Sequence, residues 1–453
     1  MPVPRPRVAA LLAALALATL AAAPAAAAEP APSPAPSPSA SPAPSPSASL
    51  AASPAPSPSP AASRSPSAGM SPGPARQALA ASTPDLVTGV AYLRAPANLK
   101  DGRYYESFPG FPDFGLTVDG AFALAATGAD DARLRAVTEF IRTGGVVGDG
   151  GFTVDSWLGI GTEYASGGSI GKVAVLAQVT GFDPRGFGGH DLIAALKDVT
   201  CASADEATGC AGPGNYTWSS SVFSQALGVL AQLRAGQAAD AAGPLAFLLG
   251  LQRPDGSFPS LIPATAEDRD VDSTAMAAMV LDLAGGHDAA LGKALAWIAG
   301  QQKEHGGFPG AAGDSTNSTA LAVQGLSLRA DAYAEELVRA RAFLAGQQNG
   351  DGGFDVALGV DGSDLRASTQ AVCGATGVSF GTLLRDVHAL PGGPATPSPL
   401  PSASRSGDGG PGLPVTGFPL TATVVAALVL IAVGAVLLVG FGFRRRAVSG
   451  GGR

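Results

Sequence analysis

The feature that most constrains the fold of this chain is a turn that recurs through its middle, a glycine-rich segment followed by an aromatic residue. Three late copies align over most of their length, at 251–258, 302–308 and 348–354, and three weaker copies precede them. The aromatic residues follow one another at intervals of 42 to 64 residues and are Tyr105, Phe152, Tyr216, Phe258, Phe308 and Phe354. Such a period indicates one supersecondary unit per repeat, whose core forms only when neighbouring units stack.

Each repeat predicts a pair of helices around the turn. A helix with apolar periodicity, such as 294–301, leads into the glycines. An alanine-rich helix that opens with small hydroxyl residues follows, as at 273–277, 318–322 and 368–372. We expect these hydroxyls to cap the second helix, and the glycine after the first helix to end it with a positive φ. Six such pairs predict an all-α domain, a closed α/α toroid, over residues 78–390.

The turns Gln-x-x-Asp-Gly-Ser-Phe and Gln-x-x-x-Gly-Gly-Phe resemble the prenyltransferase and squalene-cyclase repeat over most of residues 85–388. The resemblance implies the toroid fold. It does not imply one activity, because the superfamily includes terpene cyclases, protein prenyltransferases, cobalamin carriers and complement-like thioester domains. Function has to be tested against the chemical residues of each class.

The terpene-cyclase motif is present in part. Class II cyclases protonate an alkene with the middle aspartate of Asp-x-Asp-Asp-Thr-Ala, and residues 270–275 of this chain read Asp-Val-Asp-Ser-Thr-Ala. The resemblance makes Asp272 the candidate acid, with Ser273 in place of the third aspartate. The alternative is an acidic helix start that complements the helix dipole. We favour this alternative, because Ser-Thr-Ala recurs at 318–320, and we assign no catalytic residue.

Other chemistries lack their residues in this sequence. A prenyltransferase zinc site needs Asp, Cys and His, but the four histidines are scattered and Cys373 lies in an apolar segment without a partner at matching spacing. The thioester motif, the nucleophile elbow and the phosphate-binding lysine loop are also absent from the sequence. We therefore expect neither a metal nor a cofactor.

The second helices of the repeats should begin on one face of the toroid and line a central cup. The candidate ligand-binding residues there are Asp113, Asp119, Asp155, Trp157, Tyr164, Trp218, Asp272, Asn317 and Arg366. Aromatic rings beside carboxylates suit a carbohydrate, a peptide or a cofactor such as cobalamin. For the two tryptophans, packing in the core or at the rim is the alternative.

The N-terminus has the pattern of a secretory signal peptide at residues 1–28. Arg5 and Arg7 precede an apolar run, and Ala26-Ala27-Ala28 predicts cleavage before Glu29. A retained membrane anchor is the alternative, but the run is short for a membrane span.

The C-terminus combines three features: residues 413–417, an uncharged apolar segment at 418–443, and a tail at 444–453 that opens with three arginines. Together they resemble the sorting signal of sortase substrates in Gram-positive cells. The motif consists of Leu413, Pro414, Val415, Thr416 and Gly417. The resemblance implies cleavage after Thr416 and covalent linkage of Thr416 to peptidoglycan, with the membrane as an intermediate stage. A plain transmembrane anchor is the alternative.

Composition predicts what joins these parts. Residues 29–77 and 391–412 are rich in Pro, Ser and Ala and should form disordered stalks. Cys201 and Cys210 flank a polar loop and could form a disulfide outside the cell or, alternatively, bind a metal. A net charge of −8 gives no support to nucleic-acid binding.

These observations predict a secreted, wall-anchored surface protein whose toroid binds an unidentified extracellular ligand without catalysis. The alternatives are a glycan-active hydrolase or lyase and, third, a terpene-cyclase-type enzyme that uses Asp272. Carboxylates that converge in the cup would favour an enzyme, and an aromatic and amide lining would favour a binding protein.

Overall fold

The computed structural model describes residues 83–148 and 151–389. The predicted signal peptide, both stalks, the sortase motif and the C-terminal apolar segment lie outside the described residues. Among the residues that are described, no helix is both long and apolar enough to cross a membrane.

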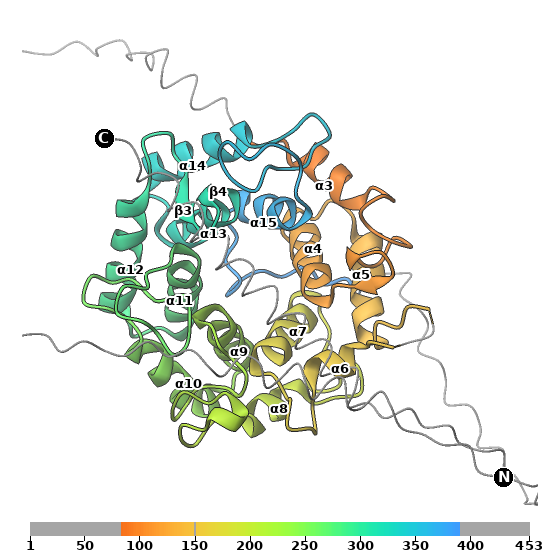
Figure 1. The fold of residues 1–453 in the computed structure, drawn as a ribbon, viewed down its shortest axis with the longest axis vertical. Coiled ribbons are helices and arrows are strands. Elements are labelled where there is room, and N and C mark those ends of the chain that lie inside the picture. Colours follow the sequence, from red (N-terminus) through yellow and green to blue (C-terminus); the bar gives the residue numbers. More distant parts are fainter. Residues whose placement is uncertain (1–82, 149–150, 390–453) are drawn as a thin grey trace, which may run out of the picture. The chain divides into compact units, whose positions relative to one another are not determined.

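Within these residues, twelve of the thirteen α-helices make up an inner and an outer ring (Figure 1). The inner helices are α4 (Phe114–Thr127), α7 (Gly167–Val179), α9 (Val222–Arg234), α11 (Val271–Ala284), α13 (Thr316–Leu326) and α15 (Leu365–Ala375). The outer helices are α3 (Leu86–Arg94), α5 (Asp131–Arg142), α8 (Leu192–Asp198), α10 (Ala238–Gly250), α12 (Asp288–Gln301) and α14 (Ala334–Gly346). Each inner helix contacts the next, and α15 contacts α4, so the ring is closed. The predicted six-pair α/α toroid is confirmed.

Short elements complete the described chain. Helix α6 (Val154–Leu158) lies between α5 and α7, and the 3-10 turns are η1 (Glu206–Thr208) and η2 (Ser327–Arg329). Two antiparallel ribbons pair β1 (Glu106–Phe108) with β2 (Phe111–Pro112), and β3 (Phe308–Gly310) with β4 (Gly313–Ser315). The domain is therefore helical apart from these ribbons.

The two rings bury different amounts of their surface. Outer helices such as α5 bury a single stripe, in that case Leu134, Val137, Phe140 and Ile141 with Thr138, as expected for an amphipathic helix. Inner helices such as α11 bury nearly every residue from Val271 to Leu281. Alanine and glycine in the inner ring permit this, because small side chains let the helices approach closely.

The aromatic residue of each repeat packs between the rings. Tyr105, Tyr216, Phe258, Phe308 and Phe354 have no exposed surface. Phe152 is half-buried and stacks on Phe111 and Phe114, with ring centroids 5.1 and 5.3 Å apart. The aromatic positions that define the sequence period thus form the core that the period predicts.

A glutamine in each late turn ties one repeat to the next. The side-chain amide of Gln252 donates to the carbonyl oxygen of Ala290, 2.8 Å away, and that of Gln302 donates to Glu336 O at 2.8 Å. In the last repeat, Gln348 reaches the first: its amide donates to Asp85 O at 2.8 Å, and Asp85 N–H donates to its oxygen at 2.8 Å. The same contact therefore links neighbours and closes the ring.

Two predictions about the helix ends are wrong in detail. The inner helices are capped by the side chains of Asp270, Ser315 and Asp364, one turn before the Ser-Thr pairs. The glycines that adopt a positive φ are Gly256, Gly306 and Gly352, several residues after the outer helices end. There a Cβ atom would overlap a carbonyl oxygen of the next outer helix, so close approach as well as φ requires glycine.

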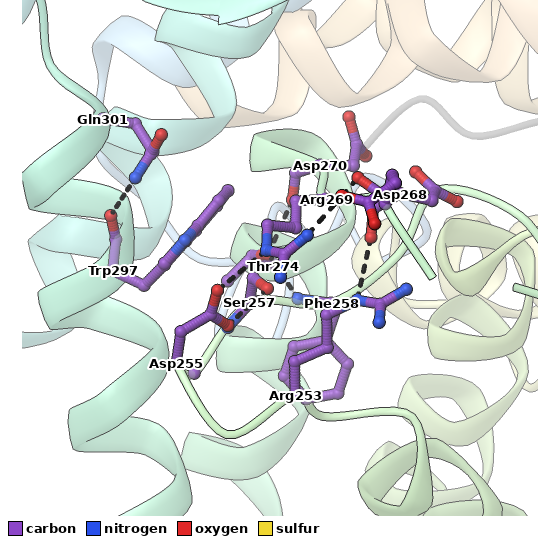
Figure 2. Close-up of polar contacts among 12 residues, drawn as sticks. Arg253, Asp255, Ser257, Phe258, Asp268, Arg269, Asp270, Thr274, Trp297 and Gln301 are labelled. Carbon is purple, nitrogen blue, oxygen red and sulfur yellow. Dashed lines mark hydrogen bonds and ion pairs between the residues drawn. The ribbon is translucent and has the colours of Figure 1, made fainter. Parts of the chain in front are cut away.

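The hydroxyls have a different role from the expected cap. Thr274 accepts a hydrogen bond from the backbone N–H of Phe258 at 2.9 Å and donates to the carbonyl of Asp270 at 2.6 Å (Figure 2). Thr319 and Ser368 make the same pair of bonds in the next two repeats. Each hydroxyl thus fixes the aromatic turn against the first turn of its inner helix.

The far end of the ring is covered by the last described segment, which crosses the centre of the ring (Figure 1). Arg234, the last residue of α9, donates to the carbonyl oxygens of Phe380, Gly381 and Leu383 at 2.8 to 3.0 Å. Phe380 packs edge-on against Phe122, with centroids 5.1 Å apart. The first turns of the inner helices lie at the opposite end, which we call the mouth.

Cys201 and Cys210 form the predicted disulfide, which closes the loop around η1. The metal-binding alternative for this pair is therefore wrong.

Close contact between α7 and α9 yields a stability prediction. A Cβ on Gly171 would lie 2.6 Å from the backbone nitrogen of Gly228, so Gly171→Ala should lower the free energy of unfolding by about 2 kcal/mol. Gly292 on α12 has open space around it, and Gly292→Ala should raise this free energy by about 0.5–1 kcal/mol. Urea denaturation measures both. Equal effects of the two substitutions would contradict the packing described here.

Candidate functional site

The mouth holds an ionic cluster formed by α4, α7 and α15. The guanidinium of Arg366 donates to Asp113 Oδ2 at 2.9 Å and lies 3.6 Å from Asp119 Oδ2. Lys172 Nζ lies 2.7 Å from Asp119 Oδ1. Asp119 and Lys172 are mostly buried, whereas about half of the Arg366 side chain is exposed. Two cationic side chains therefore contact Asp119 at the mouth.

Asp113 also makes hydrogen bonds that stabilise the local structure. Its Oδ1 accepts the N–H of Leu116 at 2.8 Å and caps α4, and its Oδ2 accepts the hydroxyl of Ser107 at 2.9 Å. These bonds explain its position without a ligand. Lys172 was not predicted, although it is the lone charge in the apolar sequence of α7 and could have been found on that ground.

Below this cluster lies a small axial cavity of about 20 Å³, which has room for about one water molecule. Its polar lining comes from Asp119, Gln324, Thr369 and Gln370, and its apolar lining includes Phe122 and Phe380. Cys373 also lines it, but burial raises the pKa of this thiol to about 12. Cys373 is thus a buried thiol and not a nucleophile at neutral pH.

The loop that precedes α11 is braced by side chains of the repeat turn (Figure 2). Asp255 accepts hydrogen bonds from the Ser257 hydroxyl at 2.7 Å and from Arg269 Nε at 2.8 Å. These two bonds, that of Ser257 first, lower the pKa of Asp255 to about 2. Arg253 Nε donates to the carbonyl of Asp268 at 2.8 Å. The start of α11, which carries Asp270 and Asp272, is therefore fixed.

Asp270 and Asp272 have separate roles. Asp270 caps α11, with its Oδ2 accepting the N–H of Ser273 at 2.8 Å. Asp272 Oδ1 is fully enclosed and has no hydrogen-bond partner among the described residues, although the residue as a whole keeps some exposed surface at the mouth. Burial raises the pKa of Asp272 to about 7; the charge of Asp270 adds to the effect, and a hydrogen bond from Ser318 opposes it.

The two aspartates of the motif therefore differ in their contacts. Asp270 makes the capping contact at the start of α11, and Asp272 lies in the first turn of that helix. Burial favours the protonated form of Asp272.

Two further acceptor atoms near the axis are buried without a partner among the described residues. They are Asn317 Oδ1, on the second residue of α13, and Gln370 Oε1, on the sixth residue of α15. With Asp272, they put unsatisfied oxygens on three consecutive inner helices. Buried acceptors of this kind favour a ligand that donates hydrogen bonds.

Of the other predicted site residues, Trp157 lies beside the ionic cluster, because a Cβ on Gly115 would be 3.9 Å from both Trp157 Cζ2 and Lys172 Nζ. The Asp155 side chain is about two-thirds exposed and lies 3.0 Å from His190 Nε2. Trp157 is half-buried and packs against Phe114, with centroids 6.0 Å apart, which supports the packing alternative. Tyr164 and Trp218 are exposed neighbours beside the disulfide loop, with centroids 6.3 Å apart. The nine predicted residues therefore do not line a single cup.

Comparison with known families supports the fold. The model of the prenyltransferase alpha-alpha toroid domain matches residues 183–354 and 288–386. This part of the chain is similar to that domain, and it belongs to the α/α toroid that the structure shows. The prenyltransferase model covers the later repeats, where the glutamine turns are most regular. No curated protein matches the sequence significantly.

Several solved structures share the helical arrangement at low identity. A variant of the type II terpene cyclase MstE from Scytonema, in complex with merosterolic acid A, is 16% identical, with a TM-score of 0.47 over 64% of this chain and 95% of that chain. A protein from Actinoplanes is 18% identical, with a TM-score of 0.46 over 64% and 98%. A glycosidase variant in complex with glucose is 14% identical, with a TM-score of 0.45 over 66% and 98%. At these values the comparisons assign no activity.

The raised pKa of Asp272 predicts a specific pH dependence of stability. The native state keeps the proton up to about pH 7, whereas an unfolded aspartate releases it near pH 4. The contribution of Asp272 to stability is therefore fully present below about pH 4 and is lost as the pH rises through about 7. When the pH rises from 5 to 7.5, this contribution to the free energy of unfolding should fall by about 2–3 kcal/mol in the unsubstituted protein. Asp272→Asn should not show this fall.

Urea denaturation at the two pH values measures this difference. Asp288→Asn is the control, because the Asp288 side chain is 90% exposed. It should keep the pH dependence of the unsubstituted protein. Parallel pH profiles for Asp272→Asn and the unsubstituted protein would show that Asp272 is not protonated at neutral pH.

Proposed function

We propose that the toroid is an acid–base enzyme that acts on an extracellular glycan bound across the mouth of the inner ring, with Asp272 as the proton donor. The observation that carries this proposal is the enclosed, unpartnered carboxyl oxygen of Asp272. A general acid works best when its pKa is near the operating pH, and burial brings Asp272 into that range.

Asp119 supplies the second carboxyl group that such chemistry requires. Glycoside hydrolysis commonly uses one protonated and one ionised carboxyl group on either side of the scissile bond. Asp119 forms ion pairs with Lys172 and Arg366, and its helix α4 lies opposite α11 in the inner ring (Figure 1). A substrate that spans the mouth would therefore meet an acid on one side and a carboxylate on the other.

The surroundings favour a glycan over a terpene. A carbocation cascade needs a chamber that encloses the substrate and excludes water, whereas the axial cavity has only about 20 Å³ and amide groups in its wall. The unpartnered oxygens of Asn317 and Gln370 suit sugar hydroxyls, which donate hydrogen bonds. The terpene-cyclase alternative is supported only by the partial motif that contains Asp272.

Ligand binding without catalysis is the second candidate. The amide side chains of Asn317, Gln324 and Gln370 near the axis favour it, because amides can recognise a ligand but are not acids or bases. In either case we propose that the protein acts outside the cell, attached to peptidoglycan through Thr416 after cleavage by sortase.

Hydrolysis assays test the enzyme directly. The protein would be incubated with soluble cell-wall polysaccharide and with a panel of nitrophenyl glycosides, and the release of reducing ends or nitrophenol measured. We expect Asp272→Asn to lower kcat by about 100-fold or more with little change in KM, because only proton donation is removed. The rate of the unsubstituted protein should fall above about pH 7, as Asp272 loses its proton.

Asp288→Asn is the matched control and should keep full activity. If Asp272→Asn keeps the activity of the unsubstituted protein, Asp272 is not the acid. If the unsubstituted protein hydrolyses no substrate but binds the same polysaccharide in calorimetry, the binding function is correct and the enzyme proposal is wrong.

A further inference from the structure

A second concave site lies at the rim, beside the disulfide loop and away from Asp272. It is a groove of about 640 Å³, within the size range of small-molecule sites. One wall is the disulfide loop, including Asp205, Glu206 and Gly209, and the other is formed by Ile262 and Pro263. In the sequence, Trp218 and Ser220 lie between the residues of the two walls. We call this site the rim groove.

Both walls are fixed by hydrogen bonds. The disulfide joins Cys201 to Cys210, and Asp205 and Cys210 exchange two backbone hydrogen bonds of 2.9 Å each. On the other side, Ile262 N–H donates to the carbonyl of Ser220 at 2.9 Å. A groove held in this way is formed before a ligand arrives, so binding requires little ordering of the protein.

Trp218 offers a rigid aromatic surface in the rim groove. Its side chain is exposed, yet its indole N–H already donates to the carbonyl of Glu163 at 2.8 Å, and its backbone N–H donates to Thr208 O at 3.1 Å. Its backbone φ of 55° is one that residues other than glycine rarely adopt. Because the N–H is occupied, the ring can offer a ligand only its apolar face.

The charges of the rim groove are of one sign. Asp205 and Glu206 are exposed, and neither forms an ion pair with a lysine or arginine of the described residues; the Asp205 carboxylate accepts the Ala207 N–H at 3.0 Å and the Thr208 hydroxyl at 2.9 Å, which fix its position. The lining includes no cationic side chain, so it repels anions and attracts a cation. An indole face beside carboxylates also favours an ammonium group, through the negative potential of the ring.

We propose that the rim groove binds a saccharide with a free amino group. The apolar C–H face of a pyranose ring packs on the indole of Trp218, while the ammonium group and hydroxyls donate to the carboxylates of Asp205 and Glu206. This combination uses both the flat apolar surface and the unpaired negative charge. The site is independent of the proposed activity of Asp272.

Calorimetric titration of the full chain with two tetrasaccharides tests the proposal. We expect the tetramer of glucosamine to bind at least tenfold more tightly than the tetramer of N-acetylglucosamine, which has the same rings but no ammonium groups. Glu206→Gln should weaken binding of the glucosamine tetramer and reduce its dependence on salt. Asp288→Asn, at an exposed residue that belongs to neither proposed site, should leave this binding unchanged.

The key variant is Trp218→Gly, because glycine accepts the positive φ while the substitution removes the ring together with its hydrogen bond to Glu163 O. It should reduce binding at least tenfold while the protein stays folded, as a cooperative melting transition would show, and Trp218→Phe, which also lacks the indole N–H, should restore part of the affinity. Leu358→Ala, at another exposed apolar residue, is the control and should bind normally.

Three results would overturn the proposal. They are equal binding of the two tetramers, full binding by Trp218→Gly, and tighter binding of a tetralysine peptide than of the glucosamine tetramer. The last result would show that the groove recognises an amine on a peptide and not on a sugar.

Discussion

The interaction on which the rest of the structure depends is the hydrogen-bonded pair between Gln348 and the backbone of Asp85. The equivalent glutamines of the two preceding repeats, Gln252 and Gln302, bond to the next outer helix. The last repeat has no next helix, so Gln348 can bond only to the first outer helix or to solvent. Because it reaches the first helix, the helix pairs form a ring and not an open solenoid. Only a closed ring gathers the first turns of six inner helices around one axis, and every candidate residue of the mouth depends on that arrangement.

Closure also decides which chemistry is possible at the axis. The far end is covered by the segment that carries Phe380, and the small inner helices leave only a narrow cavity beneath the mouth. Polar groups on the first turns therefore face a ligand that approaches from one side and stays near the surface. Asp272 meets this condition on the first turn of α11, beside a carboxylate and a hydroxyl, whereas Asp119 lies one turn deeper on α4, beside two cations.

The sequence predicts the fold well because the repeated residues act locally. Phe258, Phe308 and Phe354 are buried by their own repeat and its neighbour, so their spacing already contains the helix-pair unit. The site is less predictable because it is assembled from residues far apart in the chain. Lys172 has meaning only beside Asp119 on another helix, and Tyr164 and Trp218 lie at the rim because the disulfide loop places them there. The hydroxyl residues were assigned to caps because nothing in the sequence shows that an aspartate or serine one turn earlier fills that position.

The pair Asp270 and Asp272 shows how a repeat can acquire chemistry without losing its fold. The repeat needs one capping side chain at the start of each inner helix, and Asp270 meets this need as Ser315 and Asp364 do in later repeats. The second residue of the helix is then free to vary: it is Asp272 in α11, Asn317 in α13 and Arg366 in α15. At this position a carboxyl group gains nothing from the cap and loses most of its hydration, so its proton is retained. A neutral amide at the equivalent place in α13 shows that folding does not require an acid there. Helix capping alone therefore does not explain the acid in α11, and this is the reason why we propose a chemical role for it.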